Sequence, residues 1–251
     1  MTYIHLIYIP WKSYSEYYQM KEPNAIQCLE ENKTNFDTSY YYHLKNMVPK
    51  HIHVLLWTFD SLKCFSDKKN PQLWDMLWNQ VHHPVMIVDF YRWFVVYHLG
   101  GFYLQYGSKL LFDIRYIESI LFTMKSNTNI KLFVETNITD SESILYGRKY
   151  RIRNGIPEEN IRVATQSFYT PIRYCPFIKV MLNTILNRIR NYTVQEDYDI
   201  LYISGNALVS EIYDKYYEKG EIDLISYDER QQLIRYSSKG SWRTDYITKN
   251  T

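Results

Sequence analysis

The chain contains little glycine, proline or cysteine, and each shortage excludes a class of protein. Its 251 residues include 8 glycines, 8 prolines and 3 cysteines, against 46% hydrophobic residues. This balance excludes a disordered or low-complexity chain. Cys28, Cys64 and Cys175 are widely spaced and form no CxxC motif, so neither a disulfide framework nor a zinc site is expected. Reduced thiols of this kind fit a cytoplasmic protein.

The sequence also lacks an excess of charge of one sign. It has 29 Lys and Arg residues against 27 Asp and Glu residues, a net charge of +2. So small an excess does not indicate nucleic acid or an anionic membrane as the main partner. The sequence contains no run of about 18 apolar residues, the length needed to span a bilayer. The opening MTYIHLIYIP has no basic region and is interrupted by Pro10, so it predicts a strand and not a signal peptide.

Apolar stretches that alternate with helical stretches indicate the fold class. Residues 4–9, 51–57 and 131–135 are apolar and predict buried strands, while 14–42 and 176–190 favour helices. Strands that alternate with helices are typical of an α/β protein with a parallel sheet. No linker or repeat divides the chain, so we expect one domain over residues 1–251.

The stretch at 88–109, VDFYRWFVVYHLGGFYLQYGSK, predicts a helix, a glycine turn and a strand. Pro84 suits the first helical turn, and Gly100 and Gly101 suit its end. Asp89 and Arg92 are three residues apart, so one helix face carries both. They could bind one polar ligand together, or form a simple surface pair contributing ~0.2–0.5 kcal/mol. In the strand, the period of two places Tyr103, Gln105, Gly107 and Lys109 on one face.

This order of residues resembles the DXD-containing sugar-binding glycosyltransferases, a family that includes yeast initiation mannosyltransferases and the catalytic domains of large clostridial toxins. The family pattern is D-x-x-R, a helix, G-G-x-Y and then D-x-D. Asp89, Arg92, Gly100, Gly101 and Tyr103 match it at the expected spacing. The resemblance implies a GT-A-type fold, in which a central, mostly parallel sheet is flanked by helices. It also implies that Asp89 and Arg92 hold hydroxyl groups of a donor sugar.

The chain departs from the family at the DXD motif, where Gln105 and Gly107 replace both aspartates. In the family these acids hold Mn²⁺ or Mg²⁺ and the donor ribose, so we expect no metal cofactor here. Gln105 could still form a hydrogen bond with a ribose hydroxyl. Lys109 could supply a positive charge for phosphate, although an edge lysine is the plainer interpretation. Should a carboxylate have moved into the site, Asp60 and Asp113 are the candidates.

Further residues match the family along nearly the whole chain. Tyr8 stands where the family has an aromatic that stacks on the nucleotide base, with Trp11 as the alternative; simple core packing of Tyr8 stays open. Residues 200–208, ILYISGNAL, resemble a strand and turn, which places Ser204, Gly205 and Asn206 at the donor. Ser241 and Trp242 match the closing G-S-W, in which the hydroxyl meets the donor phosphate. Gln166 and Ser167 match a polar donor contact loosely.

Other polar groups have plainer interpretations. Asp60 is expected to act as a turn or helix cap. The adjacent His82 and His83 are expected on a solvated turn, without a third ligand at metal spacing. The basic cluster at 147–155, GRKYRIRNG, is expected on a solvated surface, and binding of an acceptor or phosphate is the alternative.

The resemblance implies a glycosyltransferase that moves a hexose from a nucleotide-diphosphate sugar, such as a UDP- or GDP-sugar, to a glycan or glycoprotein acceptor. By resemblance the anomeric configuration is retained. The alternative is a non-catalytic pseudo-glycosyltransferase that binds nucleotide sugar, glycan or protein, because both acids of the motif are replaced. Nucleic-acid binding ranks far behind, since no concentrated basic stripe is present.

Overall fold

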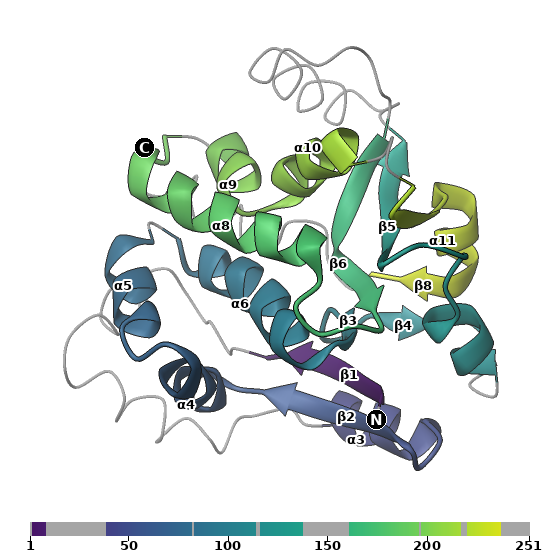
Figure 1. Cartoon of the computed structure of the whole chain (residues 1–251). Coiled ribbons are helices and arrows are strands. Elements are labelled where there is room, and N and C mark those ends of the chain that lie inside the picture. The colour runs from purple at the N-terminus through teal and green to yellow at the C-terminus, as the bar shows by residue number, and fades with distance from the viewer. Residues whose placement is uncertain are drawn as a thin grey trace, which may run out of the picture.

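The computed structural model describes residues 2–8, 39–81, 83–113, 116–137, 161–195, 197–216 and 220–236. These residues form a six-stranded sheet in the order β2-β1-β3-β6-β5-β7 and a two-stranded sheet of β4 and β8 (Figure 1). The strands are β1 Thr2–Ile7, β2 Ile52–Trp57, β3 Gly101–Leu104, β4 Lys109–Leu110, β5 Ile130–Asn137, β6 Ile161–Thr170, β7 Ile222–Ile225 and β8 Ile234–Arg235. In the large sheet only β6 runs antiparallel to its neighbours. The predicted α/β class with a central, mostly parallel sheet is confirmed.

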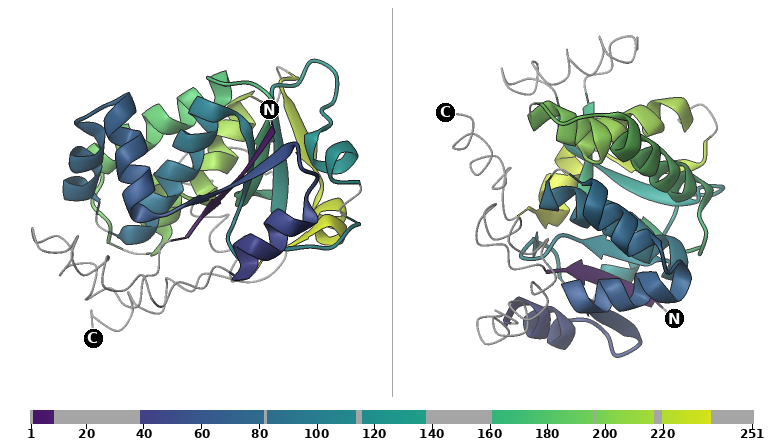
Figure 2. Two further views of the ribbon diagram at one scale, coloured as in Figure 1. Left: turned by 90° about the horizontal axis from the view of Figure 1, so that it is seen from below. Right: turned by 90° about the vertical axis from the view of Figure 1, so that its left-hand side faces the viewer.

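Helices cover both faces of the large sheet. They are α3 Ser39–Met47, α4 Phe59–Lys69, α5 Leu73–Gln80, α6 Pro84–Leu99, α8 Pro176–Asn191, α9 Asp197–Ile203, α10 Asn206–Tyr216 and α11 Tyr227–Leu233, with a π-helical segment η3 Glu118–Phe122. One core lies between the sheet and α4, α5, α6, α8, α9 and α10. A second core lies on the other face, beneath α3, η3 and α11. Figure 2 shows the strands between these two groups of helices.

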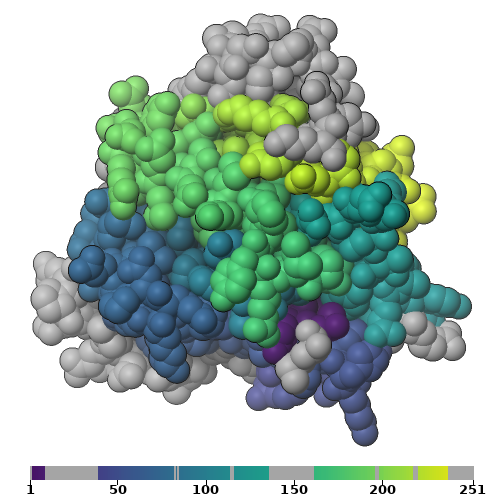
Figure 3. All heavy atoms as spheres, viewed as in Figure 1, coloured from purple at the N-terminus to yellow at the C-terminus, as the bar shows by residue number. Residues whose placement is uncertain are grey.

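The helix α6 is the most deeply buried part of the first core. Phe90, Tyr91, Trp93, Val95 and Val96 are each at most 1% exposed. A helix that is apolar on all sides must be enclosed by other elements. The α6 helix packs on β1, β3 and α8, and the space-filling view shows the surfaces of α4–α6 and α8–α10 in contact (Figure 3).

The glycine turn after α6 brings the chain directly against β1. Gly100 ends the helix with φ +69°, and Gly101 follows with φ +103°. A Cβ atom on Gly101 would lie 2.6 Å from the Tyr3 carbonyl oxygen. Both the positive φ and this close approach require glycine at position 101. His5 reinforces the junction, because its Nε2 donates to the Gly100 carbonyl over 2.8 Å and its Nδ1 accepts from Trp57 Nε1 over 3.1 Å.

Three local predictions are wrong. The strand after the glycine turn ends at Leu104, and Lys109 begins β4 in the separate small sheet, so one strand face does not run from Tyr103 to Lys109. Residues 197–203 form the helix α9 and not a strand. His83 is 3% exposed and caps α6 through its Nδ1, which accepts from the Val85 amide over 3.2 Å; it is therefore not on a solvated turn. His82 lies outside the described residues.

Among the described residues, no helix has the length and apolar character needed to cross a membrane.

Candidate functional site

Asp89 and Arg92 form a buried ion pair on α6. Arg92 Nη2 lies 2.7 Å from Asp89 Oδ1, and the two side chains are 8% and 7% exposed respectively. Burial raises the pKa of the Asp89 carboxyl, and the Arg92 guanidinium and the Ser204 hydroxyl reduce this shift. The interpretation as a simple surface pair is wrong, because the charges are enclosed by the fold.

Three further elements hold this pair. Ser204 Oγ, between α9 and α10, donates to Asp89 Oδ2 over 2.9 Å. Arg92 Nη1 donates to the Thr165 carbonyl on β6 over 2.8 Å, and the guanidinium lies 5.3 Å from the ring centre of Tyr103 on β3. The tertiary structure thus brings Asp89, Arg92, Tyr103 and Ser204 into one cluster, although they come from separate parts of the chain.

Asn206 extends the cluster toward β5. Its Oδ1 accepts from Thr165 Oγ1 over 2.7 Å, so the residue whose carbonyl binds Arg92 also binds Asn206. Its Nδ2 donates to Glu135 Oε2. Gly205 lies against α9, where an added Cβ would be 3.0 Å from Leu201 Cα. The turn at 204–206 therefore joins the Asp89 pair to a second polar group.

That second group centres on Glu135, which sequence reasoning placed in a strand but did not single out. Its carboxylate accepts from Arg162 Nε over 2.6 Å and from Gln166 Nε2 over 3.0 Å, besides Asn206. Glu135 is the charged residue that ends the apolar run 131–135, and this position could have marked it as a candidate site residue. Only the pairing of β5 with β6 shows which groups surround it.

Tyr8 lies in an aromatic group at the end of β1. Its ring centre is 4.5 Å from that of Tyr106, and Tyr106 is 5.0 Å from Tyr40 on α3. Tyr40 also donates its hydroxyl to the Ser108 carbonyl. All three tyrosines are partly exposed. One side of the candidate base-stacking residue is therefore covered by Tyr106, the residue between Gln105 and Gly107.

Gln105 and Gly107 lie in a turn after β3. The Ser108 amide donates to the Gln105 carbonyl over 3.0 Å, and Gly107 has φ +81° and is exposed. The Gln105 amide donates to the Gln166 carbonyl over 2.7 Å, which places this turn beside the Glu135 group. Lys109 is exposed on β4, opposite Arg235 of β8.

Ser241, Trp242, Trp11 and the basic cluster at 147–155 lie outside the described residues. The described chain ends at Tyr236, whose hydroxyl is 2.7 Å from Ser167 Oγ. Ser167 pairs with Leu104, the last residue of β3.

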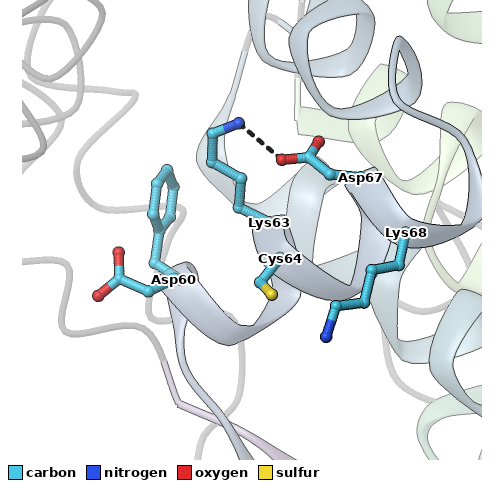
Figure 4. Close-up of a pocket in the computed structure, with 6 residues that line it drawn as sticks. Asp60, Lys63, Cys64, Asp67 and Lys68 are labelled. Carbon is cyan, nitrogen blue, oxygen red and sulfur yellow. Dashed lines mark hydrogen bonds and ion pairs between the residues drawn. The ribbon is translucent and has the colours of Figure 1, made fainter.

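The alternative carboxylates lie on the surface, unlike the buried Asp89 pair. Asp60 is exposed in the first turn of α4, where Thr58 is the cap, and Asp113 is exposed. Asp60 borders a surface hollow of 530 Å³ that is also lined by Phe59, Lys63, Cys64, Asp67 and Lys68 (Figure 4). None of the predicted donor residues lines it. Over the residues that the structure describes, no three His, Cys, Asp or Glu side chains are grouped to hold a metal ion.

No protein-family model and no curated protein matches the sequence. Several solved structures are similar in fold, and two are described here. One is described as the PaToxG glycosyltransferase, with 10% identity, a TM-score of 0.46 and coverage of 86% of this chain and 69% of that chain. The other is mouse xyloside xylosyltransferase 1 in its apo form, with 9% identity, a TM-score of 0.44 and coverage of 89% and 84%.

Proposed function

We propose that this protein is a glycosyltransferase that transfers a hexose from a nucleoside-diphosphate sugar to a glycan or protein acceptor, with retention of the anomeric configuration. The observation that carries the proposal is the hydrogen bond between Ser204 and Asp89. It joins two residues whose positions were assigned to a donor site by separate sequence matches. Arg92, Tyr103 and Asn206 belong to the same cluster.

Each group has a role in this proposal. Tyr8 stacks on the nucleobase, with Tyr106 packed beside it. The Asp89 and Arg92 pair binds donor hydroxyls through the small fraction of each side chain that is exposed. Gln105 binds the ribose, and Gly107 lets the backbone turn near the diphosphate. Ser241 and Trp242, which lie outside the described residues, are assigned to the donor phosphate by the sequence match alone.

A nucleoside-diphosphate leaving group gains negative charge as the sugar departs. A divalent cation is the common means of stabilising this charge, and oxygen ligands from one or two carboxylates hold it. Positions 105 and 107 offer no carboxylate. We therefore propose that donor binding does not depend on a protein-held metal ion.

The same observation favours a second candidate function, a non-catalytic module that binds nucleotide sugar, glycan or a protein partner. In this case the cluster around Asp89 keeps its binding role and turnover is absent. A measurement of turnover separates the two candidates, because both predict donor binding.

A thermal-shift panel of UDP- and GDP-sugars, with and without Mn²⁺, tests donor binding. A ligand present at 100 times its dissociation constant stabilises the native state by about 2.7 kcal/mol. We expect one nucleotide sugar to raise the melting temperature, and the Asp89→Asn variant to lose this response. Release of UDP or GDP from that donor then reports turnover. If no nucleotide sugar in the panel shifts the melting temperature, the assignment of a UDP- or GDP-sugar as the ligand is wrong for both candidate functions.

We also propose a cytosolic location. Of the described cysteines, the exposed Cys64 and the buried Cys175 are both free thiols, which suits a reducing compartment.

A further inference from the structure

Two arginines converge on Glu135 at the end of β5. Arg162, near the start of β6, donates its Nε to the carboxylate over 2.6 Å. Arg230, on α11, donates its Nη2 to the Glu135 carbonyl and its Nε to the Val134 carbonyl over 3.1 Å. Arg230 is 4% exposed, and its guanidinium carbon lies 5.0 Å from the ring centre of Tyr227 and 4.9 Å from that of Tyr236.

The charges of this group do not balance. Arg230 Nη1 donates to the Ile234 carbonyl over 3.4 Å, so all its hydrogen bonds go to carbonyl groups, and no carboxylate in the described ranges pairs with it. Glu135 is thus one carboxylate for two guanidinium groups. A buried charge without an opposite charge beside it is unfavourable. The group carries one positive charge in excess, which a bound anion would balance.

Arg162 has the geometry to contact such an anion. Its Nε binds Glu135, while its two terminal nitrogens make no hydrogen bond within the part of the chain that the structure describes. The side chain is 19% exposed, so the guanidinium reaches the surface without being freely solvated. A guanidinium with free terminal nitrogens can bind a phosphate through two parallel hydrogen bonds.

Arg162, Arg230 and Glu135 are connected to the turn that stands in place of the DXD motif. The Gln105 amide binds the Gln166 carbonyl over 2.7 Å, and Gln166 Nε2 binds Glu135 Oε1 over 3.0 Å. Gln166 Oε1 is buried and has no partner among the described residues. Glu135 therefore holds Arg162 in position on one side and the strand next to Gln105 on the other.

We propose that Arg162 binds the diphosphate of the donor and that Arg230, bound to the same segment of β5, adds positive charge to the site. Together they would replace the metal ion that carboxylates at positions 105 and 107 would hold. This inference rests on the proposed function, since it names the group that neutralises the leaving diphosphate. The positive charge that stabilises the diphosphate comes from the protein itself. Glu135 is a positioning residue, and its own charge opposes anion binding.

Calorimetric titration with inorganic pyrophosphate, UDP and uridine tests the proposal. We expect Arg162→Gln to weaken binding of pyrophosphate and UDP by about tenfold or more, because a charged hydrogen bond contributes ~1.5–3 kcal/mol. Binding of uridine, which has no phosphate, should not change. Arg162→Lys keeps the charge but loses the paired terminal donors of the guanidinium, so we expect an intermediate loss of pyrophosphate and UDP affinity. If Arg162→Gln does not fold, Arg162→Lys provides the test.

Two further variants sharpen the result. Arg173→Gln is the matched control, because Arg173 is exposed beyond the opposite end of the same strand; its pyrophosphate affinity should equal that of the unmodified protein. Glu135→Gln keeps an acceptor for Arg162 and removes a negative charge, so pyrophosphate should bind more tightly. If Glu135 instead held a metal ion, the same substitution would weaken UDP binding and abolish a Mn²⁺ effect.

The outcomes separate this inference from the proposed function. Equal pyrophosphate and UDP affinity in Arg162→Gln and the unmodified protein overturns the inference, even if a nucleotide sugar binds. No pyrophosphate binding to the unmodified protein overturns it as well. Pyrophosphate binding that depends on Arg162, without a response to any nucleotide sugar, supports the anion site and contradicts the donor function.

Discussion

Ser204 and Asp89 are 115 residues apart in the chain and are joined by a hydrogen bond of 2.9 Å from the serine hydroxyl to the carboxylate. Both side chains are buried, and the same carboxylate pairs with Arg92. The bond fixes the turn before α10 to the middle of α6. It therefore connects the folding of the C-terminal half of the domain with the geometry of the candidate site.

Arg92 is expected to matter for folding as well as for ligand binding. Its replacement by alanine leaves Asp89 as an uncompensated buried charge, and loss of one partner of a buried pair costs ~3–5 kcal/mol. We predict a decrease of this size in the free energy of unfolding of Arg92→Ala, measured by urea denaturation. Lys63→Ala is the control, because its pair with Asp67 is about one-third exposed and contributes at most ~1 kcal/mol. A loss below ~1 kcal/mol in Arg92→Ala would mean that the pair is solvated.

Gly101 is expected to tolerate no side chain. Gly101→Ala places a Cβ 2.6 Å from the Tyr3 carbonyl oxygen at a φ of +103°, so strand β1 must move. We predict a destabilisation of ~3 kcal/mol or more from strain and clash together. Gly220→Ala is the matched control. Gly220 also has positive φ, +62°, but nothing lies within 4 Å of an added Cβ, so the loss should be about 1–2 kcal/mol. Equal losses in urea denaturation would contradict the close approach of the two strands.

His5 is expected to make stability depend on pH. Burial lowers the pKa of its imidazole from 6.5 to about 4, with a smaller opposing effect from the Gly100 carbonyl. Between these values the unfolded chain binds more protons than the folded chain, so the free energy of unfolding falls as the pH falls. The contribution of neutral His5 to the free energy of unfolding is fully present above about pH 6.5. At most ~3 kcal/mol of it is lost by pH 4, because each unit of difference between the two pKa values corresponds to about 1.4 kcal/mol.

The measurement is urea denaturation of the unmodified protein and His5→Asn from pH 4 to 7.5. We expect His5→Asn to be less stable at pH 7.5 and to lose less stability on acidification. A slope remains, because burial also lowers the pKa of His83 and of His98 to about 4. His53→Asn, at an exposed position on β2, should keep the pH dependence of the unmodified protein. The assignment to His5 fails if His5→Asn and His53→Asn give the same slope.

Donor binding is expected to be indifferent to Mn²⁺ and to EDTA. Positions 105 and 107 carry an amide and a glycine, so a metal ion bound only by phosphate oxygens and water has no protein anchor. We predict the same UDP affinity in titrations with Mn²⁺ and with EDTA. A strong requirement for Mn²⁺ would show that a carboxylate such as Asp60, Asp113 or Glu135 holds the ion.

Restoring an acid should create metal dependence. Gly107→Asp introduces a carboxylate in the turn beside Gln105, and aspartate tolerates the positive φ of +81° better than most residues. We predict that Mn²⁺ increases the UDP affinity of Gly107→Asp and not that of Gly107→Asn, which has the same shape without the charge. Lys109→Ala tests the earlier candidate cation, and a loss of UDP affinity there would mean that Lys109 shares the phosphate contact.

The elements with strong local patterns could be predicted from the sequence alone. The apolar runs at β1, β2 and β5, the helix from Pro84 and the glycine turn at 100–101 follow from periodicity and from the φ angles that only glycine adopts freely. The pairing of Asp89 with Arg92 follows from their spacing on a helix. These features depend on residues close together in the chain.

The tertiary structure decided what could not be determined locally. It made residues 197–203 a helix, because their apolar side chains pack against α8 and α10. It ended β3 at Leu104, after which the chain turns and Lys109 begins β4 in the two-stranded sheet. It buried the Asp89 pair and gathered Arg162 and Arg230 around Glu135. Burial and the pairing of β5 with β6 set these contacts, and both depend on residues far apart in the sequence.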